Sequence, residues 1–298
     1  MQQALPRIDI SGFLSGDSAE RERVARAWDA AMCELGLVTI VGHGVPAQVV
    51  DALFSHAKTF FRQQHEEKMR SCLHRGYGAG GYCPVGVEAV ARSTGDAKAP
   101  PDMVENLVFS HGGDAAKEVV MPASPAELQP SIAAYSEQLN ELLTTLMRLS
   151  ATALQLPPDH FAAAYERRKC NLRLAHYPAV PAGEPAAPGV FRYGAHTDYT
   201  GFTVLRQDPG ADGLQAQLRS GEWVGVPSEE GSFVVNAGDL IQVLLLLLLP
   251  VLLLLPVLLL PKRRLIGPPR SLLACADFSP AAPSPATHTH RWTSGVDQ

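Results

Sequence analysis

His196 and Asp198 are the two residues whose types and spacing most directly suggest metal chemistry. A single residue, Thr197, separates them, and they lie at the start of a strand-like run that follows a loop rich in glycine and proline. Because residues i and i+2 of a strand point to the same face, the imidazole and the carboxylate can converge on one ion. Two histidines and one carboxylate on one octahedral face are the ligand set of non-haem Fe(II) oxygenases. The pair therefore predicts an iron site, and the alternative is a polar pair that caps the start of a strand.

The residues around this pair extend the motif in a fixed order. Residues 193–205 read YGAHTDYTGFTVL, and they are followed by Gly-Leu-Gln at 213–215 and by FVVNAGD at 233–239. This series resembles the metal-binding region of the isopenicillin N synthase-like, Fe(II)/2-oxoglutarate-dependent oxygenases. Residues 5–10 and 41–45 resemble the N-terminal helical region of the same family. The resemblance covers about residues 5–242.

The resemblance implies an α+β, mainly β fold, in which a double-stranded β-helix, or jelly roll, is flanked by N-terminal and other helices. It implies that His196 and Asp198 bind Fe(II), with 2-oxoglutarate as cosubstrate and O₂ as oxidant. The family's R-L-x-x-Y-P strand matches residues 173–178, so Arg173 and Tyr177 are candidates for binding the cosubstrate. His43 and His176 are expected to be structural, and Asn236 and Asp239 are expected to form a turn.

The chain departs from the family after residue 242. In the family, a second metal-binding histidine lies about 50 to 60 residues after the His-x-Asp pair, and an R-x-S motif that binds the 2-oxoglutarate carboxylate follows. Here the corresponding window contains no side chain that can bind iron, and Arg270 is followed directly by Ser271. Arg270 is retained as a candidate for binding the cosubstrate. His288 and His290, far downstream, are the candidates for the third ligand.

The window itself is unusual, because residues 243–260 consist of 13 Leu, 3 Val and 2 Pro. Three interpretations are open. The stretch resembles a membrane span with Lys262, Arg263 and Arg264 as its basic flank, although two prolines interrupt it. It is alternatively a true divergence from the family. The third interpretation is a shifted reading frame or a misassembled repetitive gene after codon 242, which explains the lost motifs and the near-homopolymer together.

The elements that must position the pair divide the chain into a helical first half and a β second half. A strand at 5–10 precedes a helix with a capping box at Asp17 and Glu20 and a stop at Gly36. A strand at 37–41 and a helix from Pro46 follow, and the charged residues 65–68 at the end of that helix are expected to be solvated. Residues 72–124 are rich in Gly and Pro without periodicity, so we expect a long segment ordered against the core or lining a site.

A long helix is predicted from about 125 to 155, and short strands are predicted from 171 onward. The expected regions are an N-terminal helical region at 1–120, a support helix at 121–165, the jelly-roll core at 166–242 and an atypical C-terminal region at 243–298.

Composition limits the partners. The 25 basic and 30 acidic residues give a net charge of −5, so there is no basic surplus for nucleic acid. The five cysteines include no Cys-x-x-Cys pair, and the N-terminus lacks an apolar leader, which favours a reducing cytoplasm with mostly buried cysteines. We expect a small-molecule substrate and no membrane attachment.

The leading hypothesis is an oxidoreductase that oxidises a small organic substrate and releases succinate and CO₂. The first alternative is a catalytically inactive jelly roll or binding module that lacks the distal histidine and the R-x-S motif. The second is an iron oxidase of the same family that does not use 2-oxoglutarate, and the third is a membrane-attached oxygenase.

Overall fold

The computed structural model describes residues 5–72, 80–95, 97–111, 120–163, 170–179, 191–199, 201–211 and 213–241. Within these ranges the chain is α+β, with helices and strands that alternate first and a run of strands at the end. The helices are α1 (Ser11–Ser15), α2 (Ser18–Glu34), α3 (Ala47–Phe61), α4 (His65–Met69), the 3₁₀ helix η1 (Val90–Thr94) and α5 (Leu128–Ala153). The strands are β1 (Arg7–Asp9), β2 (Leu37–Val41), β3 (Gly81–Cys83), β4 (Glu105–His111), β5 (Cys170–His176), β6 (Phe202–Leu205), β7 (Gln215–Gln217), β8 (Trp223–Gly225) and β9 (Phe233–Ala237).

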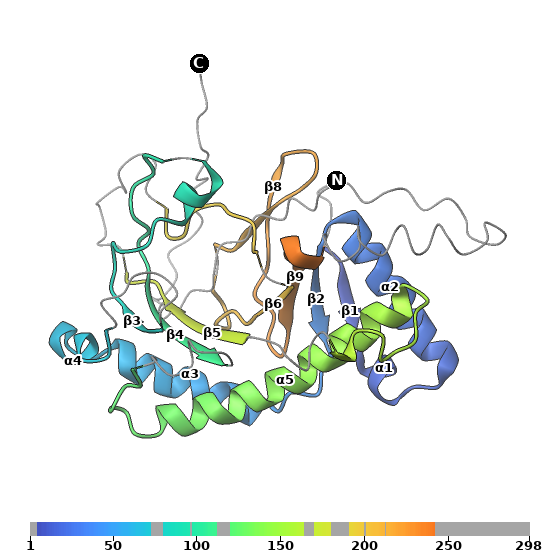
Figure 1. Ribbon diagram of the computed structural model, residues 1–298, viewed down its shortest axis with the longest axis horizontal. Helices are drawn as coiled ribbons and strands as arrows, with labels where there is room; N and C mark the ends of the chain where they lie inside the picture. The colour runs from blue at the N-terminus through green and yellow to red at the C-terminus, as the bar shows by residue number, and fades with distance from the viewer. Residues whose placement is uncertain are drawn as a thin grey trace, which may run out of the picture.

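The described strands form two sheets and a hairpin. One sheet has the order β1-β2-β9-β6, in which β1 runs parallel to β2 and the other neighbours are antiparallel. The second sheet is the antiparallel set β3-β4-β5, and β7 pairs with β8. Figure 1 shows the two sheets side by side, with β3, β4 and β5 on one side and β1, β2, β6 and β9 on the other. In β9, Asn236 is paired with both Leu37 and Thr203, so it lies in the interior of its sheet.

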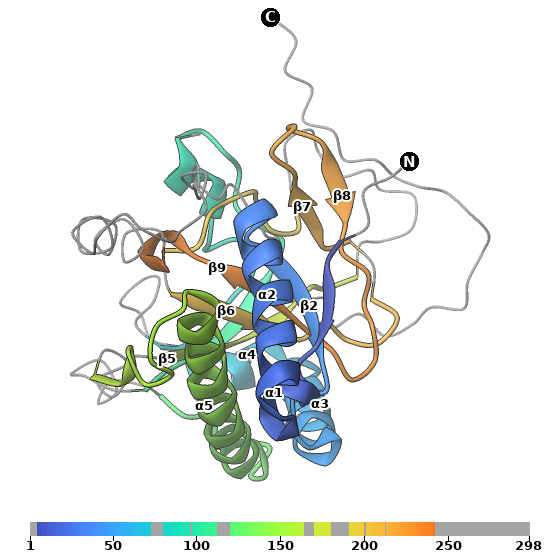
Figure 2. The same ribbon diagram turned by 90° about the vertical axis from the view of Figure 1, so that its right-hand side faces the viewer.

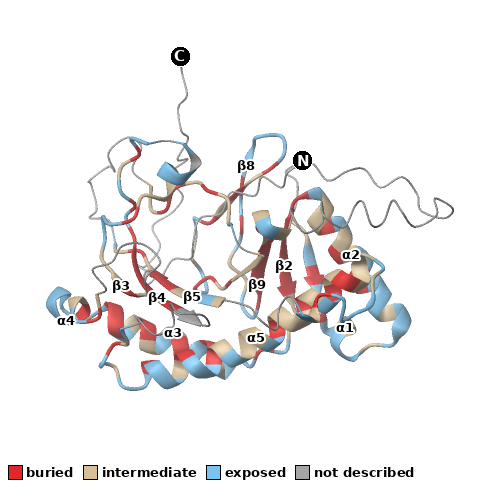
Figure 3. Cartoon of the chain, viewed as in Figure 1, coloured by how far each residue is buried: buried red, intermediate tan, exposed pale blue. Residues whose placement is uncertain are grey.

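Three helices cover one side of both sheets. α3 and α5 run beneath them in Figure 1, and Figure 2 shows α2 beside α3 and α5 on that side. The principal core joins the faces of these helices to both sheets, and Figure 3 shows the buried residues on their facing surfaces. Trp28 is 2% exposed within this core, and its indole N–H donates to the hydroxyl of Ser150 on α5 at 3.1 Å.

The predicted features of α2 and α3 are confirmed. The Asp17 carboxylate accepts a hydrogen bond from the Glu20 backbone N–H at 2.9 Å, which caps α2. Gly36 ends that helix with φ 71°, a conformation that favours glycine. α3 buries Val50, Leu53, Ala57, Phe60 and Phe61 on one face, as its periodicity predicts.

Residues 72–124 contain strands that the sequence pattern did not reveal. β3 and β4 lie in this segment, and β4 pairs with β5 from Glu105 opposite His176 to His111 opposite Cys170. Residues 104–107 are all buried, so β4 shows no alternation between core and solvent residues. The expectation that this segment is ordered against the core is confirmed for its described residues.

The surface prediction for residues 65–68 is confirmed for His65, Glu66 and Glu67, which are exposed, and is wrong for Lys68. Lys68, at the charged end of the second predicted helix, is 8% exposed, and its ammonium lies 2.6 Å from the buried carboxylate of Glu105. The ion pair joins α4 to β4 and places the lysine in the interior. The long helix is confirmed as α5, with ends two or three residues inside the predicted ones.

Cys33, Cys72, Cys83 and Cys170 form no disulfide within the described residues and are partly exposed, so the expectation that the cysteines are mostly buried is wrong for these four. None of the helices in the described ranges is long and apolar enough to cross a bilayer. The Leu-rich stretch at 243–260 lies outside the described residues.

Candidate metal centre

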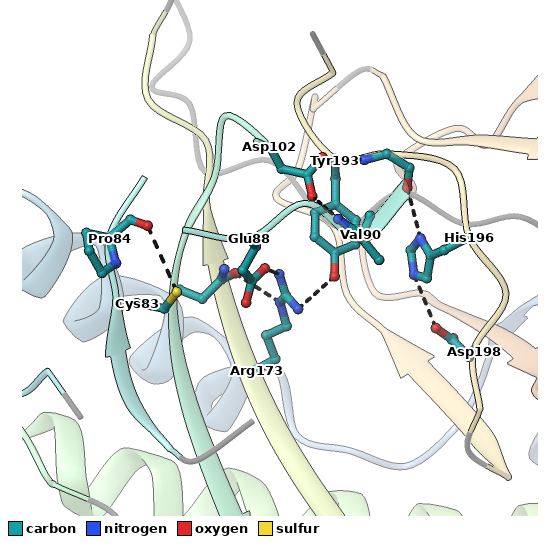
Figure 4. Close-up of polar contacts among 11 residues, drawn as sticks. Cys83, Pro84, Glu88, Val90, Asp102, Arg173, Tyr193, His196 and Asp198 are labelled. Carbon is teal, nitrogen blue, oxygen red and sulfur yellow. Dashed lines mark hydrogen bonds and ion pairs between the residues drawn. The ribbon is translucent and has the colours of Figure 1, made fainter. Parts of the chain in front are cut away.

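His196 and Asp198 converge, although not on a strand. They lie in the irregular segment that precedes β6, and Figure 4 shows both side chains turned toward one another. His196 Nε2 is 3.3 Å from Asp198 Oδ1. The predicted convergence of imidazole and carboxylate is therefore present, while the predicted strand begins only at Phe202.

The imidazole of His196 is held from its other nitrogen. The ring is buried, at 7% exposure, and Nδ1 lies 3.0 Å from the carbonyl oxygen of Gly194. Because a carbonyl oxygen only accepts, Nδ1 carries the proton and donates. The ring of Tyr193 packs edge-on against the imidazole at 5.0 Å between centroids. These contacts aim Nε2 at Asp198, as the outer hydrogen bond of a metal-binding histidine does.

The carboxylate of Asp198 is held in the same way. Oδ2 accepts hydrogen bonds from Thr203 Oγ1 at 2.6 Å and from Asn236 Nδ2 at 2.8 Å. These donors come from β6 and β9, where the two residues are directly opposite each other. Burial acts to raise the pKa of the Asp198 carboxyl, but hydrogen bonds from His196, Asn236 and Thr203 outweigh burial and lower the pKa to about 2. The group is a carboxylate at neutral pH.

The two facing atoms are placed as two ligands of one cation would be. With Nδ1 protonated, a neutral imidazole presents the lone pair of Nε2 to the lone pairs of Oδ1 across 3.3 Å. Only a proton or a metal cation between them turns this contact into an attraction. Adjacent ligands about 2.1 Å from an octahedral ion lie roughly 3 Å apart, so the pair fits such an ion.

A third protein ligand is not found in the described part of the chain. There, no group of three or more His, Cys, Asp or Glu side chains is arranged to hold a metal ion. The candidates His288 and His290, the cosubstrate candidate Arg270 and the window at 243–260 all lie outside the described residues.

Asn236 has a different role from the predicted one, while Asp239 lies in a helical turn at 239–241, in agreement with the prediction. Asn236 is a strand residue at 1% exposure, not a turn former, and it contacts Asp198 directly. Asp239 follows the strand, and its backbone N–H donates to the Asp198 carbonyl at 2.8 Å. The FVVNAGD segment therefore holds the loop of His196 and Asp198 from the side. A signal was available, because the asparagine directly continues a run of apolar strand residues.

Arg173 lies in β5 and is engaged by protein groups. Its guanidinium donates to Glu88 Oε2 at 2.5 Å, to Asn106 Oδ1 at 2.9 Å and to the Tyr193 hydroxyl at 2.8 Å, as Figure 4 shows in part. Burial raises the pKa of the Glu88 carboxyl, and Arg173 opposes this rise. Tyr177 is 2% exposed and lies under the guanidinium of Arg192. Cosubstrate binding by Arg173 and Tyr177 stays a prediction.

Two other histidines have structural contacts. His176 Nδ1 lies 2.7 Å from Glu105 Oε1, and its ring stacks on Phe61 at 5.0 Å. His43 Nδ1 accepts from the Val45 N–H at 3.1 Å and so shapes the turn before α3. Both agree with the structural roles expected from the sequence.

Sequence patterns gave no indication of Thr203, Glu88 or Asp102, which also lie around the centre. Asp102 accepts hydrogen bonds from the backbone N–H groups of Val90 and Gly194 at 2.7 and 2.9 Å. The segment around Asp102 has no periodic pattern, and Gly194 lies far away in the sequence. No local sequence pattern therefore indicates the contact between Asp102 and Gly194.

Comparison with protein families gives two matches along the chain. Residues 5–124 match the model described as non-haem dioxygenase in morphine synthesis N-terminal, and residues 168–247 match the 2OG-Fe(II) oxygenase superfamily. The second match contains His196 and Asp198.

Curated relatives carry the same description. The 2-oxoglutarate-Fe(II) type oxidoreductase ppzC of Metarhizium rileyi is 31% identical over 261 residues, which cover 80% of this chain and 69% of the relative. The 2-oxoglutarate-dependent dioxygenase thnC of Trichoderma harzianum is 30% identical over 248 residues, covering 80% and 75%. The coverage agrees with the extent of the resemblance seen in the sequence.

Solved structures are similar over the same extent. A full-length Neurospora crassa protein in complex with alpha-KG has a TM-score of 0.69 and 28% identity, covering 80% of this chain and 74% of the other. JOX2 in complex with 2OG, Fe and JA has a TM-score of 0.63 and 27% identity, covering 80% and 66%.

Proposed function

The chain belongs to the 2OG-Fe(II) oxygenase superfamily, whose members use Fe(II), 2-oxoglutarate and O₂, and from this premise we propose its activity. It is a dioxygenase that binds Fe(II) through His196 and Asp198, oxidises a small organic substrate and releases succinate and CO₂. The observation that carries the proposal is the 3.3 Å approach of His196 Nε2 to Asp198 Oδ1. Hydrogen bonds at His196 Nδ1 and at Asp198 Oδ2 hold the two groups in this orientation.

The protein's own residues supply geometry and charge. The Gly194 carbonyl fixes the imidazole, and Thr203 and Asn236 occupy Oδ2 so that Oδ1 is directed to the ion. A carboxylate with a pKa of about 2 supplies a negative charge across the physiological pH range. When bound, iron with 2-oxoglutarate and O₂ supplies the oxidising equivalent.

We infer that the two described sheets belong to a double-stranded β-helix. The sheets β1-β2-β9-β6 and β3-β4-β5 lie side by side, and the loop with His196 and Asp198 leads into β6. The solved structures of the similar proteins support this assignment.

A small organic substrate is supported by the ligands of similar proteins. A second structure of the Neurospora crassa protein is in complex with alpha-KG and thymine, and JOX2 is in complex with JA. The net charge of −5 agrees with a small molecule rather than nucleic acid.

A catalytically inactive binding module is the second candidate, and it is favoured by the sequence of 243–260. This window provides no iron ligand, and the chain contains no R-x-S motif at the expected place. Loss of the basic partner of the cosubstrate carboxylate removes a charge-assisted contact of about 1.5–3 kcal/mol.

An anaerobic titration with Fe(II) and 2-oxoglutarate separates these candidates. The chelate gives a visible charge-transfer band, which we expect in the wild type and in His160→Ala, a substitution of an exposed histidine, but not in His196→Ala. Absence of the band in the wild type supports the inactive module. O₂ uptake that needs iron but not 2-oxoglutarate would instead identify a 2-oxoglutarate-independent oxidase.

A further inference from the structure

We propose that Asp102 is a positioning residue for His196 and that it acts through the backbone of Gly194. The inference rests on the proposed function in that His196 is taken to bind the metal. It concerns a residue of the N-terminal region, about 90 positions before the metal-binding pair.

The carboxylate of Asp102 joins two segments. It is 2% exposed, and Oδ1 accepts from the Gly194 N–H at 2.9 Å while Oδ2 accepts from the Val90 N–H at 2.7 Å. The Asp102 backbone is itself fixed, because its N–H donates to the Glu88 carbonyl at 2.7 Å. Figure 4 shows the carboxylate between Val90 and the loop that leads to His196.

Gly194 transmits this position to the imidazole. Its N–H is bound by Asp102, and its carbonyl accepts from His196 Nδ1 at 3.0 Å. The residue is also pressed against η1, since a Cβ at this position would lie 2.9 Å from the Ala91 Cβ. A shift of the Gly194 backbone therefore moves the group that orients His196.

Two further contacts hold the same loop from the same segment. The Met103 N–H donates to the Phe191 carbonyl at 3.1 Å. Glu88 binds Arg173, whose guanidinium binds the hydroxyl of Tyr193, and the Tyr193 ring packs against His196. Neither of these contacts is to Gly194. The Asp102 carboxylate is the group that bonds to Gly194, the residue whose carbonyl orients the imidazole.

The matched controls are substitutions of Asp208. Its carboxylate is also nearly buried and is paired with Lys58. Asp208 follows β6 in the chain, whereas Asp198 precedes this strand. Asp208→Ala and Asp208→Asn repeat the chemical changes of Asp102→Ala and Asp102→Asn without touching the loop.

The first readout does not need metal. Long-range ¹H–¹⁵N NMR of the metal-free chain labelled at histidine reports which ring nitrogen carries a proton, and His196→Ala assigns the signal. We expect Nδ1 of His196 to be protonated in the wild type and in both Asp208 variants. In Asp102→Ala the Nδ1 preference should be lost, and Asp102→Asn, which keeps one acceptor and the volume, should be intermediate. An unchanged Nδ1 signal in folded Asp102→Asn and Asp102→Ala overturns the proposal.

The second readout is the affinity for Co(II), measured by visible absorption. Substitution of groups that orient metal ligands typically weakens metal binding about 10- to 100-fold, and we expect this range for Asp102→Ala. The Asp208 variants should stay within about twofold of the wild type. Equal weakening by the Asp102 and Asp208 variants contradicts the proposal. A wild type that binds no Co(II) contradicts the proposed function instead, and the imidazole signal then decides the role of Asp102 alone.

Discussion

The amide of Asn236 donates a hydrogen bond to Asp198 Oδ2 over 2.8 Å, and Oδ1 of the same carboxylate thereby faces His196. This contact joins the end of β9 to the loop before β6. The orientation of the carboxylate thus depends on the pairing of two strands, and this dependence can be tested.

Asn236→Ala should weaken metal binding about 10- to 100-fold, because Oδ2 loses a donor and the carboxylate can rotate. Equilibrium titration with Co(II) measures the effect. Asn171→Ala, a substitution of an exposed asparagine in β5, is the matched control and should not change the affinity. An Asn236→Ala protein with wild-type affinity would show that the carboxylate is fixed without this amide.

Thr203→Val keeps the side-chain shape and removes the second donor to Asp198 Oδ2. Either donor alone can hold the oxygen in part, so the Thr203→Val/Asn236→Ala double variant should lose more affinity than the sum of the single changes. The coupling should be about 0.5 kcal/mol or more. Thr144→Val on α5 removes a hydroxyl that donates to the Asn140 carbonyl of its own helix, and it should show no coupling with Asn236→Ala.

Gly194→Ala should destabilise the fold by about 1–3 kcal/mol and weaken metal binding, because the new methyl group meets Ala91. Chemical denaturation and Co(II) titration measure the two effects. Gly225→Ala in β8 adds a methyl group with nothing within 4 Å and should be nearly neutral. Comparable losses in both variants would argue against the close contact between the loop and η1.

Glu105→Gln should remove part of the pH dependence of stability. Burial acts to raise the pKa of Glu105, but hydrogen bonds from His176, Lys68 and Tyr82 outweigh it and lower the pKa below the ordinary 4.5. A carboxyl with a lowered folded pKa stabilises the fold fully above its unfolded pKa and loses this contribution as pH falls through the folded pKa. The difference in unfolding free energy between wild type and Glu105→Gln should therefore be largest near pH 7 and decrease below about pH 4.5.

Urea unfolding between about pH 7 and pH 3 measures this difference. Glu222→Gln, on the exposed turn between β7 and β8, is the control and should show a flat difference. A constant difference for Glu105→Gln across the range would mean that the carboxylate gains nothing from its buried partners.

Local signals were sufficient for α2, α3 and α5 and for the convergence of His196 and Asp198. The cap at Asp17, the stop at Gly36 and the apolar face of α3 involve neighbours in sequence, and each is found as predicted. His196 and Asp198 were found because an ordered motif surrounds them. Such features depend on residues only a few positions apart.

Contacts between distant segments could not be predicted in this way. Lys68 is buried because Glu105, 37 residues later, supplies its counter-charge. β4 was missed because its partner β5 is remote and its residues 105–107 are buried without alternation. Asn236 has the residue type of a turn former, and only the pairing of β9 with β6 brings it to Asp198.

The pairing of β2 with β9 also affects how the chain acquires its fold during synthesis. Leu37 is paired with Asn236, about 200 residues later. At about 5–20 residues per second, a ribosome needs roughly 10–40 s to make this stretch. During that interval β1 and β2 have no partner from β9, so the apolar strand Leu37–Val41 lies unpaired on one edge. Slow closure of this sheet is then the expected kinetic consequence of the long sequence separation between β2 and β9.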